Sequence, residues 1–167
     1  MASRFKDLLR NEYVKSIILL LIIIFCIAGF WLGLKAYLVT DYPLLAVASG
    51  SMKPTLNEGD LIVVQGGLEG SIIVAEIGTG DIIIFHRPGD PDELIVHRAV
   101  EKWQDGDIWK FHTWGDNNPQ QDSWIVRETD IIGKVVGVVP YVGHIPLFVH
   151  TTNGKIIIII LIWFEKH

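Results

Sequence analysis

An uninterrupted apolar run near the N-terminus constrains the fold of this chain more than any other feature. Residues 16–34 (SIILLLIIIFCIAGFWLGL) are 19 consecutive residues without a charged side chain. At about 1.5 Å of rise per residue, a helix of this length nearly matches the hydrocarbon core of a bilayer, which is about 30 Å thick. The sequence therefore predicts a transmembrane helix over residues 16–36 and a lipid bilayer as a partner of the chain.

The charges that flank this run predict its orientation. The arm of residues 1–15 holds four basic residues against two acidic ones, whereas the far side has Lys35 and then Asp41. Basic residues are enriched on the cytoplasmic side of membrane helices. We therefore expect a cytoplasmic arm, with the rest of the chain on the outer face of a cell membrane or the lumenal face of the endoplasmic reticulum.

A cleaved signal peptide is the alternative interpretation of the run, and the small-x-small sequence of residues 46–48 (AVA) offers a cleavage site. Signal peptides have apolar cores of about 7 to 15 residues that end close to the cut. The run here is longer, and the small-x-small sequence lies about a dozen residues beyond its end. The pattern favours an uncleaved anchor.

Beyond the anchor the pattern is that of β structure. Short runs rich in Val, Ile and aromatic residues alternate with Gly, Pro, Asn and Asp, and Asp-Gly at 105–106 is typical of a hairpin turn. These runs are residues 44–48, 61–65, 81–86, 94–103, 108–114 and 131–139. We expect one mainly β domain over residues 37–145, small, largely antiparallel and partly closed.

Composition excludes several classes of function. The formal net charge is −5, so the chain lacks the basic surface that nucleic-acid binding requires. The single cysteine, Cys26, lies inside the apolar run, which leaves no disulfide framework and no thiolate zinc site. We expect no nucleic-acid partner and no cofactor.

Ser51 is the first candidate for a catalytic role. It lies in the sequence SGSMKPTL (residues 49–56), where Gly50 permits a tight turn and Pro54 prevents a continuing helix. Taken alone, the stretch also fits an ordinary turn.

His97 is the second candidate, and a core histidine is its alternative. Period-two alternation places Ile95, His97 and Ala99 on one face of a predicted strand. A neutral imidazole held on a rigid strand can accept the proton of a serine hydroxyl near neutral pH.

Two carboxylates lie in the polar loop of residues 115–123 (GDNNPQQDS). Asp116 and Asp122 are six residues apart, so one could orient the imidazole while the other braces the loop. Taken alone, a loop of this composition is more typical of a solvated hairpin connection. His97, Asp116 and Asp122 could also bind a metal, but they lack a tight ligand spacing.

Taken in order, these blocks resemble type I signal peptidase. The sequences SGSMKPTLNEGD, GDIIIFHRPGD, ELIVHRAV, TWGDNNPQQD and GKVVGVVPYVG follow one another along nearly the whole chain. The resemblance is closest to the archaeal and endoplasmic-reticulum branch, because a histidine stands at position 97 where the bacterial branch has lysine.

The resemblance implies a membrane-bound serine endopeptidase that removes signal peptides from exported preproteins after a small-x-small motif. Ser51 matches the nucleophile, His97 the general base, Asp122 the acid that orients the base, and Asp116 a second important carboxylate. The Ser51 N–H and the Ser49 hydroxyl are the implied oxyanion donors. Which aspartate contacts His97, and whether further membrane subunits are needed, stay open.

Substrate binding and the C-terminus complete the expectations. An extended preprotein segment could pair with a strand near residues 44–48 or 94–100. The apolar run of residues 156–164 is too short to span a bilayer, so residues 146–167 are expected to form a membrane-associated tail, with Trp163 and Lys166 near the headgroups. The competing hypothesis is a non-catalytic, membrane-anchored β module that binds exported chains.

Overall fold

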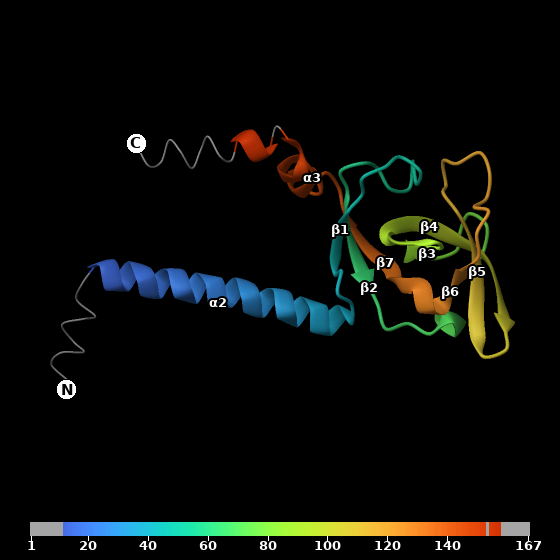
Figure 1. Cartoon of the computed structure of the whole chain (residues 1–167), viewed down its shortest axis with the longest axis horizontal. Coiled ribbons are helices and arrows are strands. Elements are labelled where there is room, and N and C mark those ends of the chain that lie inside the picture. Colours follow the sequence, from blue (N-terminus) through green and yellow to red (C-terminus); the bar gives the residue numbers. More distant parts are fainter. Residues whose placement is uncertain (1–11, 153, 158–167) are drawn as a thin grey trace. The chain divides into compact units, whose positions relative to one another are not determined.

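The computed structural model describes residues 12–152 and 154–157, in two units that divide between Tyr37 and Leu38 (Figure 1). In its described residues the first unit consists of helix α2 (Glu12–Leu38) up to Tyr37; the helix is 27 residues long and apolar enough to cross a membrane. Apart from the buried Leu38 at its end, its apolar side chains are largely exposed on all sides, as expected of a helix surrounded by lipid. The helix extends beyond the predicted span at both ends, while residues 1–11 of the arm lie outside the described part.

The second unit is built on one antiparallel sheet. In the described residues it has seven strands in the order β1-β2-β7-β3-β4-β5-β6, so β1 and β6 form its edges. The strands are β1 (Leu44–Ala46), β2 (Leu61–Gln65), β3 (Ile82–Arg87), β4 (Asp90–Asp105), β5 (Ile108–Trp114), β6 (Val126–Arg127) and β7 (Ile131–Val139). The expectation of a small, mainly antiparallel β domain is confirmed. The sheet is open rather than partly closed.

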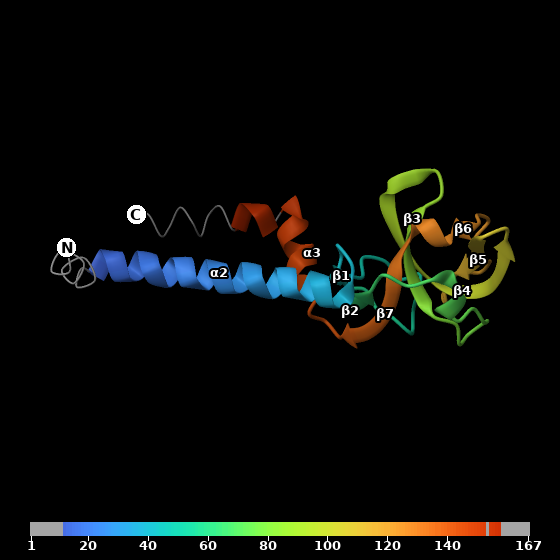
Figure 2. The same cartoon turned by 90° about the horizontal axis from the view of Figure 1, so that it is seen from below.

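The largest differences from the expected strands are at β4 and β6. β4 begins at Asp90, four residues earlier than predicted, because the turn at Gly89 has a φ of 91° and returns the chain at once. The tip of this β3–β4 hairpin projects from the sheet (Figure 2). β6 was not predicted, since a strand of two residues has no periodicity to detect. The expected turn between β4 and β5 is present, with Gly106 at a φ of 64°.

Two apolar clusters form the core on opposite faces of β4. Val96 packs against the first cluster, and Ile95 packs against the second. The first consists of Val47, Met52, Leu56, Ile62, Val64 and Ile84, and the second of Ile73, Ile83, Phe85, Ala99, Phe111 and Val126. Met52 and Leu56 are each 1% exposed, and burying such side chains stabilises a fold by about 2 kcal/mol each. The turn that carries Ser51 is therefore fixed to the core from within.

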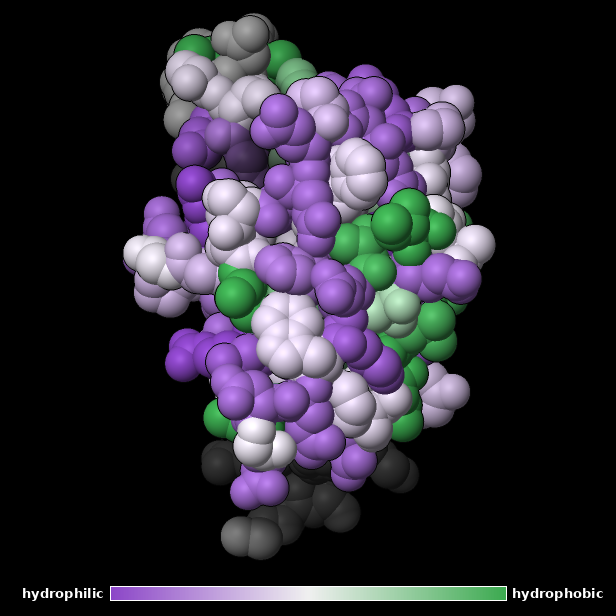
Figure 3. Space-filling view, turned by 90° about the vertical axis from the view of Figure 1, so that its right-hand side faces the viewer, coloured by the Kyte–Doolittle hydropathy of each residue, from purple (hydrophilic) through white to green (hydrophobic). Residues whose placement is uncertain are grey.

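The remaining elements lie at the surface. Short 3-10 helices occupy Gly70–Ile72 and Glu128–Asp130, and helix α3 (His144–His150) follows β7. The face of the unit that carries β4 and β5 is mostly hydrophilic, with a band of apolar side chains along the right-hand side of the view (Figure 3). The predicted interfacial helix falls mostly outside the described residues, as do Trp163 and Lys166.

Candidate active site

The turn that carries Ser51 is held by the loop that follows β5. The backbone N–H of Asn117 donates to the carbonyl of Ser51 at 2.8 Å, and the Asn117 side chain donates to the carbonyl of Gly50 at 3.1 Å. Together with the buried Met52, these bonds fix the turn on both sides. The Ser51 hydroxyl therefore projects from a rigid backbone.

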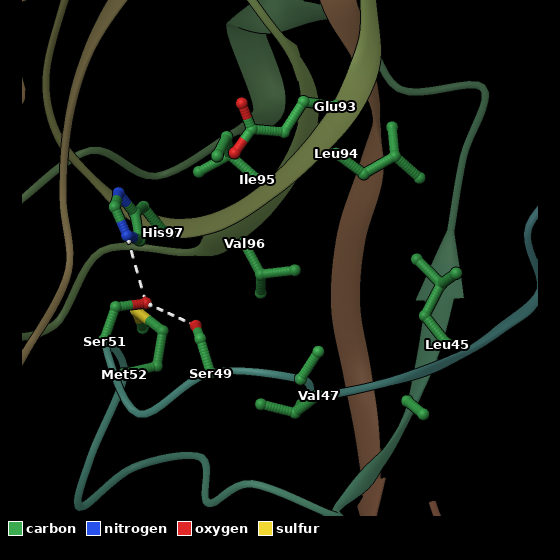
Figure 4. Close-up of a pocket in the computed structure, with 12 residues that line it drawn as sticks. Leu45, Val47, Ser49, Ser51, Met52, Glu93, Leu94, Ile95, Val96 and His97 are labelled. Carbon is green, nitrogen blue, oxygen red and sulfur yellow. Dashed lines mark hydrogen bonds between the residues drawn. The ribbon is translucent and has the colours of Figure 1, made fainter. Parts of the chain in front are cut away.

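His97 lies on β4, where pairing with Ile83 of β3 fixes its backbone. Its side chain is 8% exposed, and its Nε2 lies 3.2 Å from Oγ of Ser51. Figure 4 shows the imidazole directed at the hydroxyl across the end of a cavity. The two candidates that the sequence placed 46 residues apart are thus in hydrogen-bond contact.

Asp122 lies on the other side of the imidazole. Its Oδ2 is 2.6 Å from Nδ1 of His97, and its side chain is 6% exposed. The hydroxyl of Thr113 donates to the same oxygen at 2.7 Å, and the Asp122 N–H donates to the carbonyl of Thr113 at 3.0 Å. β5 therefore fixes both the backbone and the carboxylate of Asp122.

This arrangement assigns a tautomer to His97. A carboxylate can only accept, so Nδ1 carries the proton that bonds Asp122, and in the neutral ring Nε2 is left as an acceptor. The Ser51 hydroxyl can then donate to Nε2. This is the geometry in which an imidazole can remove the proton of a serine as the serine attacks a carbonyl.

Asp116 is held by Arg98 instead of His97. Nε and Nη2 of Arg98 donate to its two oxygens at 2.8 and 2.5 Å, and the Thr55 hydroxyl donates to Oδ2 at 2.5 Å. Burial raises the pKa of Asp116, but the hydrogen bonds from Arg98 and Thr55 and the charge of Arg98 outweigh it, and the pKa lies below its usual value. The same bidentate pair raises the pKa of Arg98.

The metal-site alternative is not supported by this geometry. His97 and Asp122 bond each other, while Asp116 is engaged by a guanidinium. Within residues 12–152 and 154–157 no three histidine, cysteine or acidic side chains are grouped as a metal site would require.

Ser49 and an elongated cavity complete the site. The hydroxyl oxygens of Ser49 and Ser51 are 3.3 Å apart. Both serines line a cavity of about 310 Å³ between residues 45–49 on one side and residues 93–97 of β4 on the other (Figure 4). β4 pairs with β5 only from Arg98 onward, so among the described residues 94–97 have a strand partner on one side alone. The cavity thus runs along a free strand edge that ends at Ser51.

Comparison with known proteins identifies the family. Residues 10–139 match the family described as signal peptidase, peptidase S26. The chain belongs to the signal peptidase family. Similar proteins include signal peptidase complex catalytic subunits SEC11 of Metarhizium robertsii, 35% identical over 125 residues, and of Tuber melanosporum, 31% identical over 156 residues. The alignments cover 70% and 87% of this chain and 69% and 83% of those relatives.

A mammalian relative is similar over a comparable part of the chain. The catalytic subunit SEC11C of Canis lupus familiaris is 31% identical over 127 residues, which cover 72% of this signal peptidase and 64% of the relative. The expectation of a signal peptidase with serine endopeptidase activity is confirmed by the family match. The non-catalytic alternative is not favoured, since it did not require Ser51, His97 and Asp122 to converge.

Five further residues of this signal peptidase site were missed by the sequence reasoning. Thr113 is fully buried on the face of β5 that also carries Trp109 and Phe111, and a hydroxyl that alternates with such residues is a signal that it has a polar partner. The others meet the site through hydrogen bonds or close approaches between distant segments, which no local pattern reveals. They are Thr55, Arg98, Gly115 and Asn117.

Proposed function

We propose that Ser51, His97 and Asp122 form the catalytic triad with which this signal peptidase cleaves signal peptides from preproteins. The observation that carries the proposal is the continuous chain of contacts, 3.2 Å from Ser51 Oγ to His97 Nε2 and 2.6 Å from His97 Nδ1 to Asp122 Oδ2. These are the distances that proton transfer needs.

The reaction takes place in two steps. Ser51 Oγ attacks the carbonyl carbon of the scissile bond while Nε2 of His97 accepts its proton, and the imidazolium then donates that proton to the leaving amine. The signal peptide is left as an ester on Ser51, and a water activated by His97 hydrolyses this acyl-enzyme. Asp122 holds the ring in place and stabilises the imidazolium. Every proposed step uses groups of the chain and water, so the mechanism includes no cofactor.

The negative oxygen of each tetrahedral intermediate needs hydrogen-bond donors. The backbone N–H of Ser51 is one proposed donor, and the hydroxyl of Ser49, 3.3 Å from the nucleophilic oxygen, is the second. Each such donor contributes about 3 kcal/mol of transition-state stabilisation in comparable sites.

Asp116 acts as a positioning residue in this proposal. Its contact with Arg98 connects the loop of residues 115–118 to β4, which carries His97. Its contact with Thr55 connects the same loop to the segment that carries Ser51. Arg98 also donates to the carbonyl of Gly80 at 2.7 Å, which fixes the guanidinium. The pair therefore maintains the relative positions of the two segments that react.

The substrate adds a strand along the free edge of β4. An extended segment before the cut lies in the cavity between residues 45–49 and residues 93–97, with its backbone paired to these strands. Val47, Met52 and Val96 provide the apolar surface for the small residues at the first and third positions before the cut. We propose that this surface is shallow and excludes larger side chains.

The membrane arrangement is proposed on the pattern of charges. Residues 1–15 lie in the cytoplasm and residues 16–36 span the membrane. Residues 37–145 form the catalytic domain on the outer or lumenal face, and residues 146–167 associate with the membrane. Because similar proteins are named as subunits of a signal peptidase complex, we also propose further membrane subunits as partners. Protection of both chain ends from added protease would contradict this topology.

The proposed triad is tested with the full chain in detergent micelles and a preprotein substrate. Ser51→Ala and His97→Ala should each abolish cleavage without unfolding the chain, while Ser71→Ala, an exposed serine on the same unit, should cleave normally. Undiminished cleavage by either triad variant would refute the mechanism. His97→Lys additionally tests whether the bacterial type of base can act in this site.

A further inference from the structure

The cavity beside Ser51 has a carboxylate at its far end. Glu93 lines the cavity together with Leu94, Ile95 and Val96. Among the described residues that line this cavity, Glu93 is the one with an acidic side chain. It lies four positions before His97 on the same strand. A substrate strand that reaches Ser51 along β4 must therefore pass Glu93.

Successive side chains of β4 lie on opposite faces of the strand, so a substrate paired with β4 has different neighbours on its two faces. Val96 packs against the cluster that contains Val47 and Met52, whereas Ile95 packs against the opposite cluster. Figure 4 shows Glu93 on the same side of the β4 ribbon as Ile95, with Val96 on the other side. Glu93 is therefore on the face opposite the apolar surface for small residues.

This division sets the register of a paired substrate. If the first and third residues before the cut face the apolar surface, they lie beside Val96 and Leu94. The second and fourth residues then lie beside Ile95 and Glu93, because paired strands keep neighbouring side chains on one face. Three residues of strand span about 10 Å, which is also the spacing from Val96 to Glu93 along β4.

Glu93 remains accessible to a second cation although it has a partner. Nη1 of Arg87 bonds its Oε2 at 2.6 Å, and the Arg87 guanidinium lies over the ring of Trp124, 5.2 Å from the ring centroid. The side chain of Glu93 is 43% exposed. The hairpin tip also carries Asp90 and Asp92, so residues 87–93 hold one basic and three acidic side chains and the local formal charge is negative.

We propose that Glu93 determines specificity for the fourth residue before the cut, favouring lysine or arginine over aspartate or glutamate. The inference rests on the proposed function, because it assumes cleavage at Ser51 and the strand register described above. At low ionic strength an exposed charge pair of this kind corresponds to a preference of about two- to fivefold in kcat/KM.

The test is a competition between two preproteins that differ only in lysine or glutamate at the fourth position and in a length tag. Both are cleaved in one tube by the full chain in detergent micelles, and the ratio of their rates gives the ratio of kcat/KM. This ratio does not depend on how much of a variant is folded. We expect a preference for lysine that weakens at about 1 M salt, where the Debye length is about 3 Å.

Variants of the enzyme then locate the source of the preference. Glu93→Gln should bring the ratio close to one and Glu93→Lys should invert it, while Asp92→Asn, the same loss of charge one residue away, should change it much less. Moving the lysine or glutamate to the fifth position should abolish the effect.

Three results of these enzyme and substrate variants would overturn the inference. They are a ratio that is insensitive to both Glu93 variants, an equal change with Asp92→Asn, or a preference found only at the fifth position. If both preproteins are cleaved at equal rates and cleavage still requires Ser51, the inference is overturned but the proposed function is not. A wild-type chain that cleaves neither preprotein would overturn the proposed function as well.

Discussion

Oδ2 of Asp122 lies 2.6 Å from Nδ1 of His97, and both side chains are more than nine-tenths buried. The second aspartate of the same loop, Asp116, forms a bidentate pair with Arg98 instead. The two carboxylates that the sequence could not tell apart therefore have different contacts, one with the imidazole and one with the scaffold around it.

Asp122→Asn should lower kcat by about four orders of magnitude. An amide can present its NH₂ group to Nδ1, which favours the tautomer with the proton on Nε2 and leaves no acceptor for the Ser51 hydroxyl. Single-turnover cleavage measures the loss, and the melting temperature checks the fold. Asp130→Asn, which removes a carboxylate paired with Arg127 at the surface, should cleave at the wild-type rate. A loss of less than tenfold with Asp122→Asn would contradict the assigned role.

Thr113→Val should lower kcat by about tenfold and leave KM unchanged. The substitution keeps the shape of the side chain but removes the hydroxyl that donates to Asp122 at 2.7 Å, and hydrogen bonds to charged groups contribute about 1.5–3 kcal/mol. Thr113→Ser, which retains the donor, should keep most of the activity. If the serine variant is as slow as the valine variant, packing rather than the hydrogen bond explains the effect.

Gly115→Ala should reduce cleavage by about a hundredfold, the usual effect of misplacing a catalytic group by about 1 Å. A Cβ at this position would lie 2.8 Å from Nε2 of His97 and 2.8 Å from the carbonyl oxygen of Ser51, so the base or the turn must move. Gly137→Ala is the matched control, because the nearest atom to its Cβ would be at an ordinary 3.4 Å. Equal rates for the two variants would show that the site tolerates the methyl group.

Local patterns predicted the strands well because their signal is itself local. The runs at residues 61–65, 108–114 and 131–139 match β2, β5 and β7 at both ends, since alternating apolar residues between turn residues are typical of half-buried strands. β1 ends at Ala46, two residues earlier than predicted, because the chain beyond Ala46 is no longer paired with β2 and lines the cavity instead.

The contacts that complete the site could not be predicted in this way. Arg98 and Asp116 are 18 residues apart and meet only because β4 and β5 are paired next to the loop. Alternation placed Arg98 on the face opposite His97 but gave no partner for its charge. The close approach of Gly115 to His97 likewise depends on the path of the loop in three dimensions, which no spacing in the sequence encodes.

The pairing of Asp116 with Arg98 makes a prediction about acid stability. The pKa of Asp116 is lower in the folded chain than in the unfolded chain. The ionised carboxylate therefore stabilises the fold at pH values above the pKa of the unfolded chain, which is about 3.9. This stabilisation is lost as the pH falls through the folded pKa. Asp116→Asn should therefore lower the free energy of unfolding by about 2 kcal/mol at neutral pH, and the difference from wild type should shrink as the solution is acidified.

Denaturant unfolding in micelles, followed by tryptophan fluorescence, measures this difference across the pH range. Asp105→Asn removes a carboxylate that pairs with Lys110 on an exposed hairpin, so it should change stability little. A pH-independent difference for Asp116→Asn would mean that the ion pair does not stabilise the fold.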